Sequence, residues 1–190
     1  MNAQKKQSMT VKEWLARLNN DPEFVRRQQE RERKRSAEVA KLRAELKPEQ
    51  DPLLAELAKA GYPVESVWDL VNTRTPYPTV VTILVKYLRI ARHPVLREGI
   101  ARALSVPEAR GAPARDLLEE LKRRADDQSK NEARFALANA LATAGDDSMR
   151  TDIETMIADP RFDDLHETLR LVLTKIAART SRDRSNGVMH

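Results

Sequence analysis

The chain offers few residues at the spacings that catalysis or metal binding requires. None of its three histidines, His93, His166 and His190, has a partner at metal-ligand or catalytic-triad spacing. The stretch DDLHE, Asp163 to Glu167, is better explained as a capped helix start than as a metal site. With no cysteine and 5 glycines, thiolate chemistry and a phosphate-binding glycine loop are not expected either. These residues predict a protein that is not an enzyme and uses no cofactor or metal.

A basic segment near the N-terminus could instead bind anionic groups such as phosphates. The segment RRQQERERKRS, Arg26 to Ser36, has no apolar residue, so it cannot be buried along its length. Alternating Arg and Glu are typical of a solvated helix, but such a helix could also contact phosphates. No interleaved aromatic residue or helix-turn-helix pattern strengthens that alternative. The candidate phosphate contacts are Arg26, Arg27, Arg31, Arg33, Lys34 and Arg35.

The net charge of +5 belongs to the ends of the chain. Residues 1–52 carry +4, residues 179–190 carry +2, and residues 53–178 carry −1. No apolar run is long enough to cross a bilayer, and the first residues lack the apolar core of a secretion signal. We therefore expect a cytoplasmic protein without a membrane partner.

One arginine recurs in three similar stretches. Arg97, Arg134 and Arg170 lie in VLREGIARALSV, EARFALANALAT and TLRLVLTKIA, about 36 residues apart, and each is followed five residues later by a polar side chain. The favoured interpretation is a ladder that bonds turn carbonyls and turn acids such as Asp127 and Asp159. The alternative is an anion-binding column.

These stretches are the second helices of a series of helical hairpins. The first helices are expected at 78–90, 113–125 and 151–158, and no convincing strand pattern occurs. Before them we expect a short helix after Thr10, a long helix from Asp21-Pro22 to about Leu46, and helices over 52–60 and 64–73. The predicted class is all-α, an α-α superhelix of stacked hairpins; a compact bundle of unrelated helices is the alternative. The expected division is an N-terminal helical extension over 1–50, a solenoid over 51–178 and a flexible tail over 179–190.

The stretches LREGIARAL and ARFALANALATAGDD resemble the second helix of HEAT repeats, particularly the short HEAT-like repeats first known from phycobilisome lyases. The resemblance covers 78–178 well and 53–72 loosely. The third unit departs most, because its Ala-Leu pair becomes Ile176-Ala177. The resemblance implies a right-handed superhelix whose second helices line a concave face. It implies no single activity, since most such proteins bind proteins and a minority bind nucleic acid.

On such a face, Phe135 and Leu171 are apolar at the position where the first repeat has Glu98. They either pack against a neighbouring helix or form an apolar spot in a groove rimmed by Arg102, Asn139 and Lys175. The residues expected on the concave, partner-binding face are Asp69, Asn72, Glu98, Arg102, Phe135, Asn139, Leu171 and Lys175.

The expected function is a noncatalytic protein-binding scaffold or adaptor, of which an immunity-type inhibitor is one form. The alternative is nucleic-acid binding, similar to the HEAT-like DNA glycosylases. That family needs a strongly positive concave face and an acidic catalytic residue in an aromatic-lined cleft. A repeat region of charge −1 and an aromatic content of 4% count against it.

Overall fold

The computed structural model describes residues 10–11, 20–71, 73–126 and 132–187, with side chains up to Arg182. No strand occurs in these ranges, so the predicted all-α class is confirmed. The chain forms two compact units, Met1–Glu45 and Leu46–His190, and their boundary falls five residues before the expected one. The short helix expected after Thr10 lies largely outside the described residues.

Helix α2 (Pro22–Lys59) begins where the sequence predicts. The Asp21 carboxylate accepts hydrogen bonds from the backbone N–H groups of Glu23 and Phe24, at 3.0 and 3.4 Å, and Pro22 occupies the first turn. Every residue from Arg26 to Ser36 is exposed.

The expected end of this helix near Leu46 is wrong, because α2 continues through Pro48 and Pro52. Each proline removes one helical hydrogen bond, which usually costs about 3 kcal/mol in a helix interior. Both prolines are exposed, and the carbonyls they leave unbonded, at Ala44 and Pro48, belong to exposed residues that water can reach. Three leucines of this part, Leu46, Leu53 and Leu57, are buried, and their packing holds the helix together across the prolines.

Unit 2 continues with seven α-helices in the described ranges and three short 3₁₀ turns between them. Two of the helices begin on a proline, where the missing N–H has no helical partner to lose. A third follows Gly111, whose φ of +80° strongly favours glycine. The α-helices are α3 (Val67–Val71), α4 (Pro78–Ile90), α5 (Pro94–Ala103), α6 (Ala112–Arg123), α7 (Glu132–Ala144), α8 (Arg150–Ile157) and α9 (His166–Gly187).

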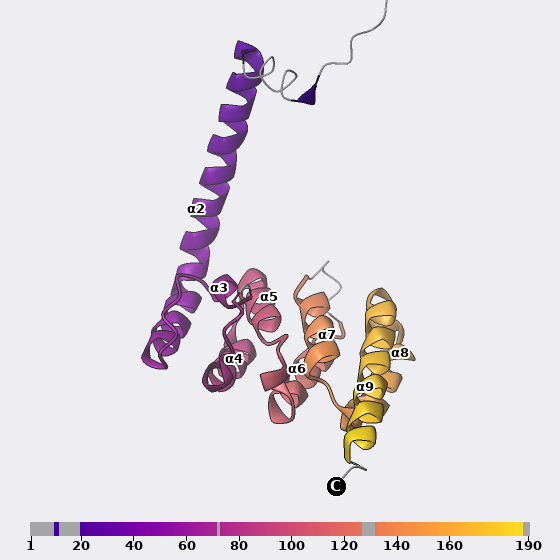
Figure 1. Ribbon diagram of the computed structural model, residues 1–190. Helices are drawn as coiled ribbons and strands as arrows, with labels where there is room; N and C mark the ends of the chain where they lie inside the picture. Colours follow the sequence, from indigo (N-terminus) through magenta and orange to yellow (C-terminus); the bar gives the residue numbers. More distant parts are fainter. Residues whose placement is uncertain (1–9, 12–19, 72, 127–131, 188–190) are drawn as a thin grey trace, which may run out of the picture. The chain divides into compact units, whose positions relative to one another are not determined.

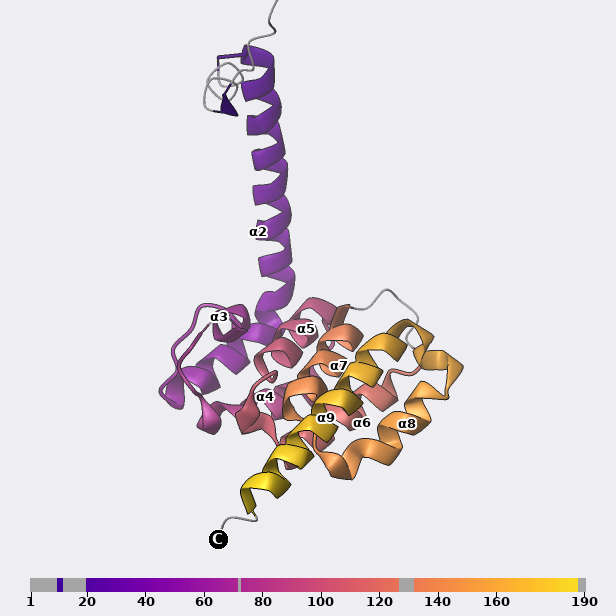
Figure 2. The same cartoon turned by 45° about the vertical axis from the view of Figure 1, so that its right-hand side comes forward.

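The helices of unit 2 lie in two layers (Figures 1 and 2). Helices α3, α5, α7 and α9 pack against one another in succession, and we call their layer the second-helix layer. Helices α4, α6 and α8 form the first-helix layer, and each packs on the helix that follows it. The predicted hairpins are therefore present, whereas the superhelical path remains a prediction.

Helix α3 is shorter than the helix expected over 64–73. The Asp69 carboxylate accepts hydrogen bonds from the backbone N–H groups of Glu65 and Ser66, at 3.0 and 2.9 Å, and so fixes where the helix begins. Helix α3 also lies close to α5, at Gly99. A β-carbon added to Gly99 would lie 2.7 Å from Cγ1 of Val67 and 3.1 Å from Cε2 of Trp68.

Two of the three recurrent arginines are buried against turns. Arg97 donates to the carbonyls of Ala91 and Arg92, the latter at 2.7 Å. Arg134 donates to the carbonyl of Arg161 at 2.7 Å and lies 3.2 Å from the Asp164 carboxylate.

Asp159, one of the two acids expected beside this ladder, pairs elsewhere, and the last arginine differs from the other two. The Asp159 carboxylate pairs with Arg161 and not with a ladder arginine, and Asp127 lies outside the described residues. Arg170 is exposed, because no further hairpin in the described residues supplies a turn beside α9.

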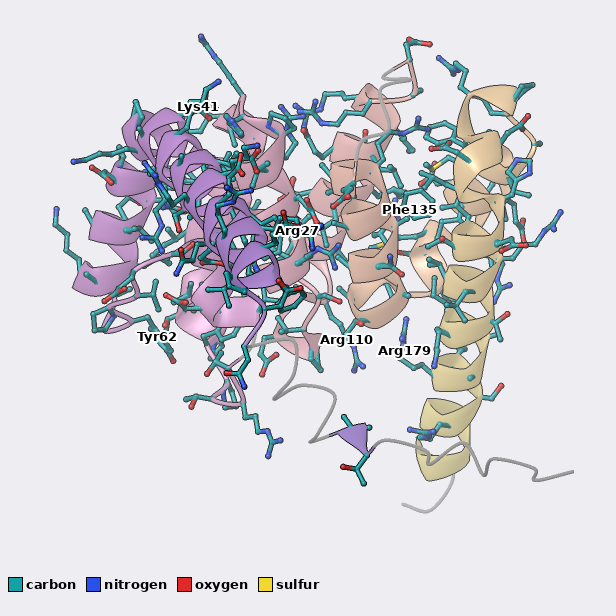
Figure 3. All side chains as sticks on the ribbon, turned by 90° about the horizontal axis from the view of Figure 1, so that it is seen from above. Arg27, Lys41, Tyr62, Arg110, Phe135 and Arg179 are labelled. Atoms are coloured by element: carbon teal, nitrogen blue, oxygen red, sulfur yellow. The ribbon has the colours of Figure 1, made fainter. Side chains whose placement is uncertain are left out.

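The expected tail does not begin at residue 179, because α9 continues to Gly187. Arg179 points from α9 toward α7, where it donates to the carbonyls of Ala142 and Gly145 at 2.8 and 2.6 Å (Figure 3). These bonds satisfy carbonyls at the end of α7, which a helix leaves without a partner of its own. The same bonds hold the second half of α9 on its neighbour.

Ion pairs join successive helices of the first-helix layer. Arg89 of α4 pairs with Asp116 of α6. The Asp152 carboxylate of α8 lies 2.9 Å from Lys122 and 3.1 Å from Arg115, both of α6. Hydrogen bonding by Lys122 holds the pKa of the Asp152 carboxyl below its usual value, against the opposing effect of desolvation.

We predict that Gly99→Ala destabilises the protein although alanine is the better helix former. The gain in helix propensity is about 1 kcal/mol, whereas overpacking a tight contact costs about 1–3 kcal/mol. Urea unfolding should therefore give a lower free energy of unfolding for Gly99→Ala than for the native chain. In the double variant Val67→Ala/Gly99→Ala the clashing Cγ1 is absent, so the two costs should be less than additive. A Gly99→Ala variant as stable as the native chain would contradict the close contact.

We also predict that the Asp152 pairs make stability depend on pH in the acidic range. Because the folded-state pKa is lowered, their contribution is fully present above the unfolded pKa of about 3.9 and is lost as pH falls through the folded value. Thermal unfolding of the native chain and of Asp152→Asn, followed between pH 7 and pH 2.5, should therefore converge toward low pH. Parallel curves would show that the pairs contribute nothing.

Candidate functional site

A groove of about 300 Å³ opens on the second-helix layer, between α3, α5 and α7. Most of its lining side chains are apolar or hydroxyl-bearing, and one is charged. The lining residues are Leu70, Val71, Thr73, Tyr77, Arg102, Ser105, Val106, Ala136 and Asn139.

Arg102 is the charged residue of the groove, and two neighbours hold it. Its Nε donates to the Glu98 carboxylate at 2.7 Å, and its guanidinium carbon lies 5.9 Å from the centre of the Trp68 ring. The Arg102 side chain is 45% exposed, whereas that of Glu98 is 10% exposed. Glu98 was expected to face a partner, and the structure instead buries it as the anchor of Arg102.

Tyr77 forms the inner wall of the groove and is buried. Its hydroxyl donates to the carbonyl of Ala103 at 2.6 Å and lies 3.4 Å from the carbonyl of Leu70, so it links the ends of α5 and α3. Burial, with a smaller effect of the Glu108 carboxylate, raises the pKa of Tyr77 to about 12. The phenol is thus neutral at physiological pH. Nothing in the sequence marked this residue, because its role depends on a contact 26 residues away.

Two large apolar side chains are exposed on the same layer. Phe135 of α7 is 44% exposed and Leu171 of α9 is 45% exposed, and α7 packs directly against α9 (Figure 3). Asn139, one turn after Phe135, donates from its side chain to the Phe135 carbonyl at 2.9 Å and reaches the groove. Lys175 of α9 is exposed.

The predicted face residues thus fall into three groups. Arg102 and Asn139 meet at the groove. Phe135, Leu171 and Lys175 share the layer without lining the groove. Among the rest, Glu98 is buried, Asp69 caps α3, and Asn72 lies outside the described residues.

The two histidines that the structure describes have local structural contacts. His93 caps α5, where its Nδ1 accepts the backbone N–H of Val95 at 3.2 Å. Nε2 of His166 lies 3.4 Å from the Asp163 carboxylate. His190 lies outside the described residues. Within the described ranges, no three His, Asp or Glu side chains gather as metal ligands would. No helix in those ranges has the length and apolar character needed to span a membrane.

The candidate phosphate contacts on α2 are all exposed. Among them Lys34 lies 3.0 Å from the Glu30 carboxylate, one turn away on the same helix. These cations belong to unit 1 and are not part of the groove.

Comparison of the chain with models of protein families, with curated proteins and with solved structures gives no match. The HEAT-like resemblance therefore stays a prediction.

We predict that Phe135→Ala leaves the free energy of unfolding nearly unchanged, because surface substitutions usually change it by about 0.5 kcal/mol or less. Phe162 is a matched control within the same unit, since it is only 2% exposed. The centre of its ring lies 5.4 Å from the guanidinium carbon of Arg134. Phe162→Ala should cost about 3–5 kcal/mol. Equal losses in urea unfolding of the two variants would place Phe135 in the core.

Proposed function

We propose that this chain is a noncatalytic protein-binding module, a scaffold or adaptor that holds its partner on the second-helix layer. It is proposed to act in the cytoplasm and to need no cofactor. An immunity-type inhibitor is one form that such a module takes.

The observation that carries the proposal is the pair Phe135 and Leu171. They occupy equivalent positions of neighbouring helices, 36 residues apart in the sequence, and both are nearly half exposed. A single exposed apolar residue is ordinary. Two at the same repeat position, on one layer beside a groove, match the apolar anchors of a protein interface.

Polar side chains share the second-helix layer with these anchors. Arg102 and Asn139 lie at the groove, and Lys175 lies one turn after Leu171 on α9. Arginine is enriched at interfaces because its stem packs while its planar head bonds carboxylates and carbonyls. An apolar centre with a polar border excludes water from the anchors and still sets the orientation of the partner.

Nucleic-acid binding is the second candidate, and the exposure of all six cations between Arg26 and Arg35 is the observation that favours it. Such contacts would be made by the N-terminal helix and would depend steeply on salt. The described lining residues of the groove include one cation, too few for a phosphate backbone.

We predict that Phe135→Asp and Leu171→Asp each reduce partner capture from the native host at least tenfold, because a charge cannot replace a desolvated anchor without cost. Ile90→Asp is the matched control. Ile90 is 61% exposed, but it lies at the end of α4 in the first-helix layer, so this variant should capture the partner normally.

The nucleic-acid candidate makes the opposite prediction. Replacement of Arg26, Arg27, Arg31 and Arg33 by glutamine would then abolish binding of a labelled 20-base-pair duplex in fluorescence anisotropy, whereas the Phe135→Asp variant would bind it normally. A captured protein that tolerates both aspartate variants and is lost from the glutamine variant would refute the second-helix layer as the binding surface.

A further inference from the structure

The guanidinium of Arg102 is only partly used by the fold. Its Nε donates to Glu98, while its two terminal amino groups make no hydrogen bond with any residue that the structure describes. They belong to a side chain that is nearly half exposed at the groove. A guanidinium presents its terminal amino groups as a planar fork that fits the two oxygens of a carboxylate.

The fork is also held in place before any ligand arrives. The buried Glu98 carboxylate fixes Nε at 2.7 Å, and the Trp68 ring lies beside the guanidinium. Most arginines on a surface lose considerable rotamer freedom when they bind. At Arg102 part of that loss has occurred on folding, so a ligand that uses the fork binds at a lower entropic cost.

The residues around the Arg102 guanidinium also restrict which ligand the groove can bind. None of the described lining residues is acidic, and the phenol among them, that of Tyr77, is occupied by the carbonyl of Ala103. The groove is also lined by apolar side chains, among them Leu70, Val71 and Val106. A volume of about 300 Å³ is at the small end of ligand sites, enough for a few side chains.

We propose that the groove binds a peptide segment of the partner in which an aspartate or glutamate stands beside an aliphatic residue. The carboxylate meets the terminal amino groups of Arg102, and the aliphatic side chain packs among the apolar lining residues of α3 and of the turn that follows α5. This inference rests on the proposed protein-binding function and names the chemistry of the partner.

The Glu98 charge shapes how this recognition works. Because Glu98 already neutralises most of the Arg102 charge, long-range attraction of an anion is weak. The interaction therefore depends on hydrogen-bond geometry at contact, and its affinity should change little with salt, unlike that of a polyanion held by many cations. A lysine at this position keeps the charge but has no planar fork.

The test is a selection of displayed random 12-residue peptides on the full-length chain. We expect enrichment of an acidic residue next to Leu, Ile or Val. For a synthetic peptide from the selection, Arg102→Lys should reduce affinity at least tenfold, and replacing the acidic residue by its amide should reduce it equally. The two changes together should cost little more than either alone, because both remove one contact.

Two variants separate a lost contact from a lost fold. Glu98→Gln/Arg102→Gln removes both charges without leaving a buried carboxylate unpaired, and it should unfold near the native temperature yet bind as weakly as Arg102→Lys. Lys59→Gln removes one exposed cation at the end of α2, away from the second-helix layer, and should bind the peptide normally.

Each other outcome decides against the proposal. An acidic peptide that Lys59→Gln weakens as much as Arg102→Lys would move the site out of the groove. Enriched peptides without an acidic residue that still require Phe135 would overturn the carboxylate assignment and leave the protein-binding function standing. No enrichment over a selection carried out without the protein would overturn both. If Arg102→Lys loses duplex DNA binding, the terminal amino groups of Arg102 bind phosphate and not a peptide carboxylate.

Discussion

The close contact between α3 and α5 at Gly99 is the constraint on which the groove depends. Because residue 99 has no side chain, the Val67 and Trp68 side chains of α3 can lie directly on the α5 backbone. This brings the Trp68 ring beside the Arg102 guanidinium and the end of α3 within reach of the Tyr77 hydroxyl. A helix of five residues has almost no stability of its own, so α3 owes its position to this contact and to its Asp69 cap.

The two layers of unit 2 are held together by different forces. Successive second helices meet through buried leucines and alanines, which supply most of the free energy of such a stack. Successive first helices are joined by partly exposed ion pairs such as Arg89–Asp116 and Lys122–Asp152, and pairs of this kind contribute modestly to net stability. Their geometry instead fixes the register between hairpins. The ion pairs between successive helices therefore lie in the first-helix layer, while Phe135 and Leu171 are exposed on the second-helix layer.

The sequence predicts the helices well where periodicity decides and poorly where a distant contact decides. The all-α class and the order of the hairpins follow from apolar spacing alone. Prolines 48 and 52 indicated a helix boundary, but buried leucines on both sides override it. Spacing placed Glu98 on the concave face, but the structure buries it as the partner of Arg102, a contact that spacing alone does not reveal. Tyr77 carried no signal at all, because its two acceptors come from separate helices.

Comparison of equivalent repeat positions separates what the fold requires from what it tolerates. At the position of Arg97 and Arg134 the same buried guanidinium bonds turn carbonyls in both hairpins, so packing dictates the residue type. One residue later stand Glu98, Phe135 and Leu171, a carboxylate and two hydrocarbons. Only the first of them is buried, and there a specific partner, Arg102, explains it. The fold therefore does not require an apolar residue at this position, and burial in the core does not account for Phe135 or Leu171. Exposed apolar side chains lower solubility and do not stabilise the isolated chain. They become favourable when a partner buries them in an interface.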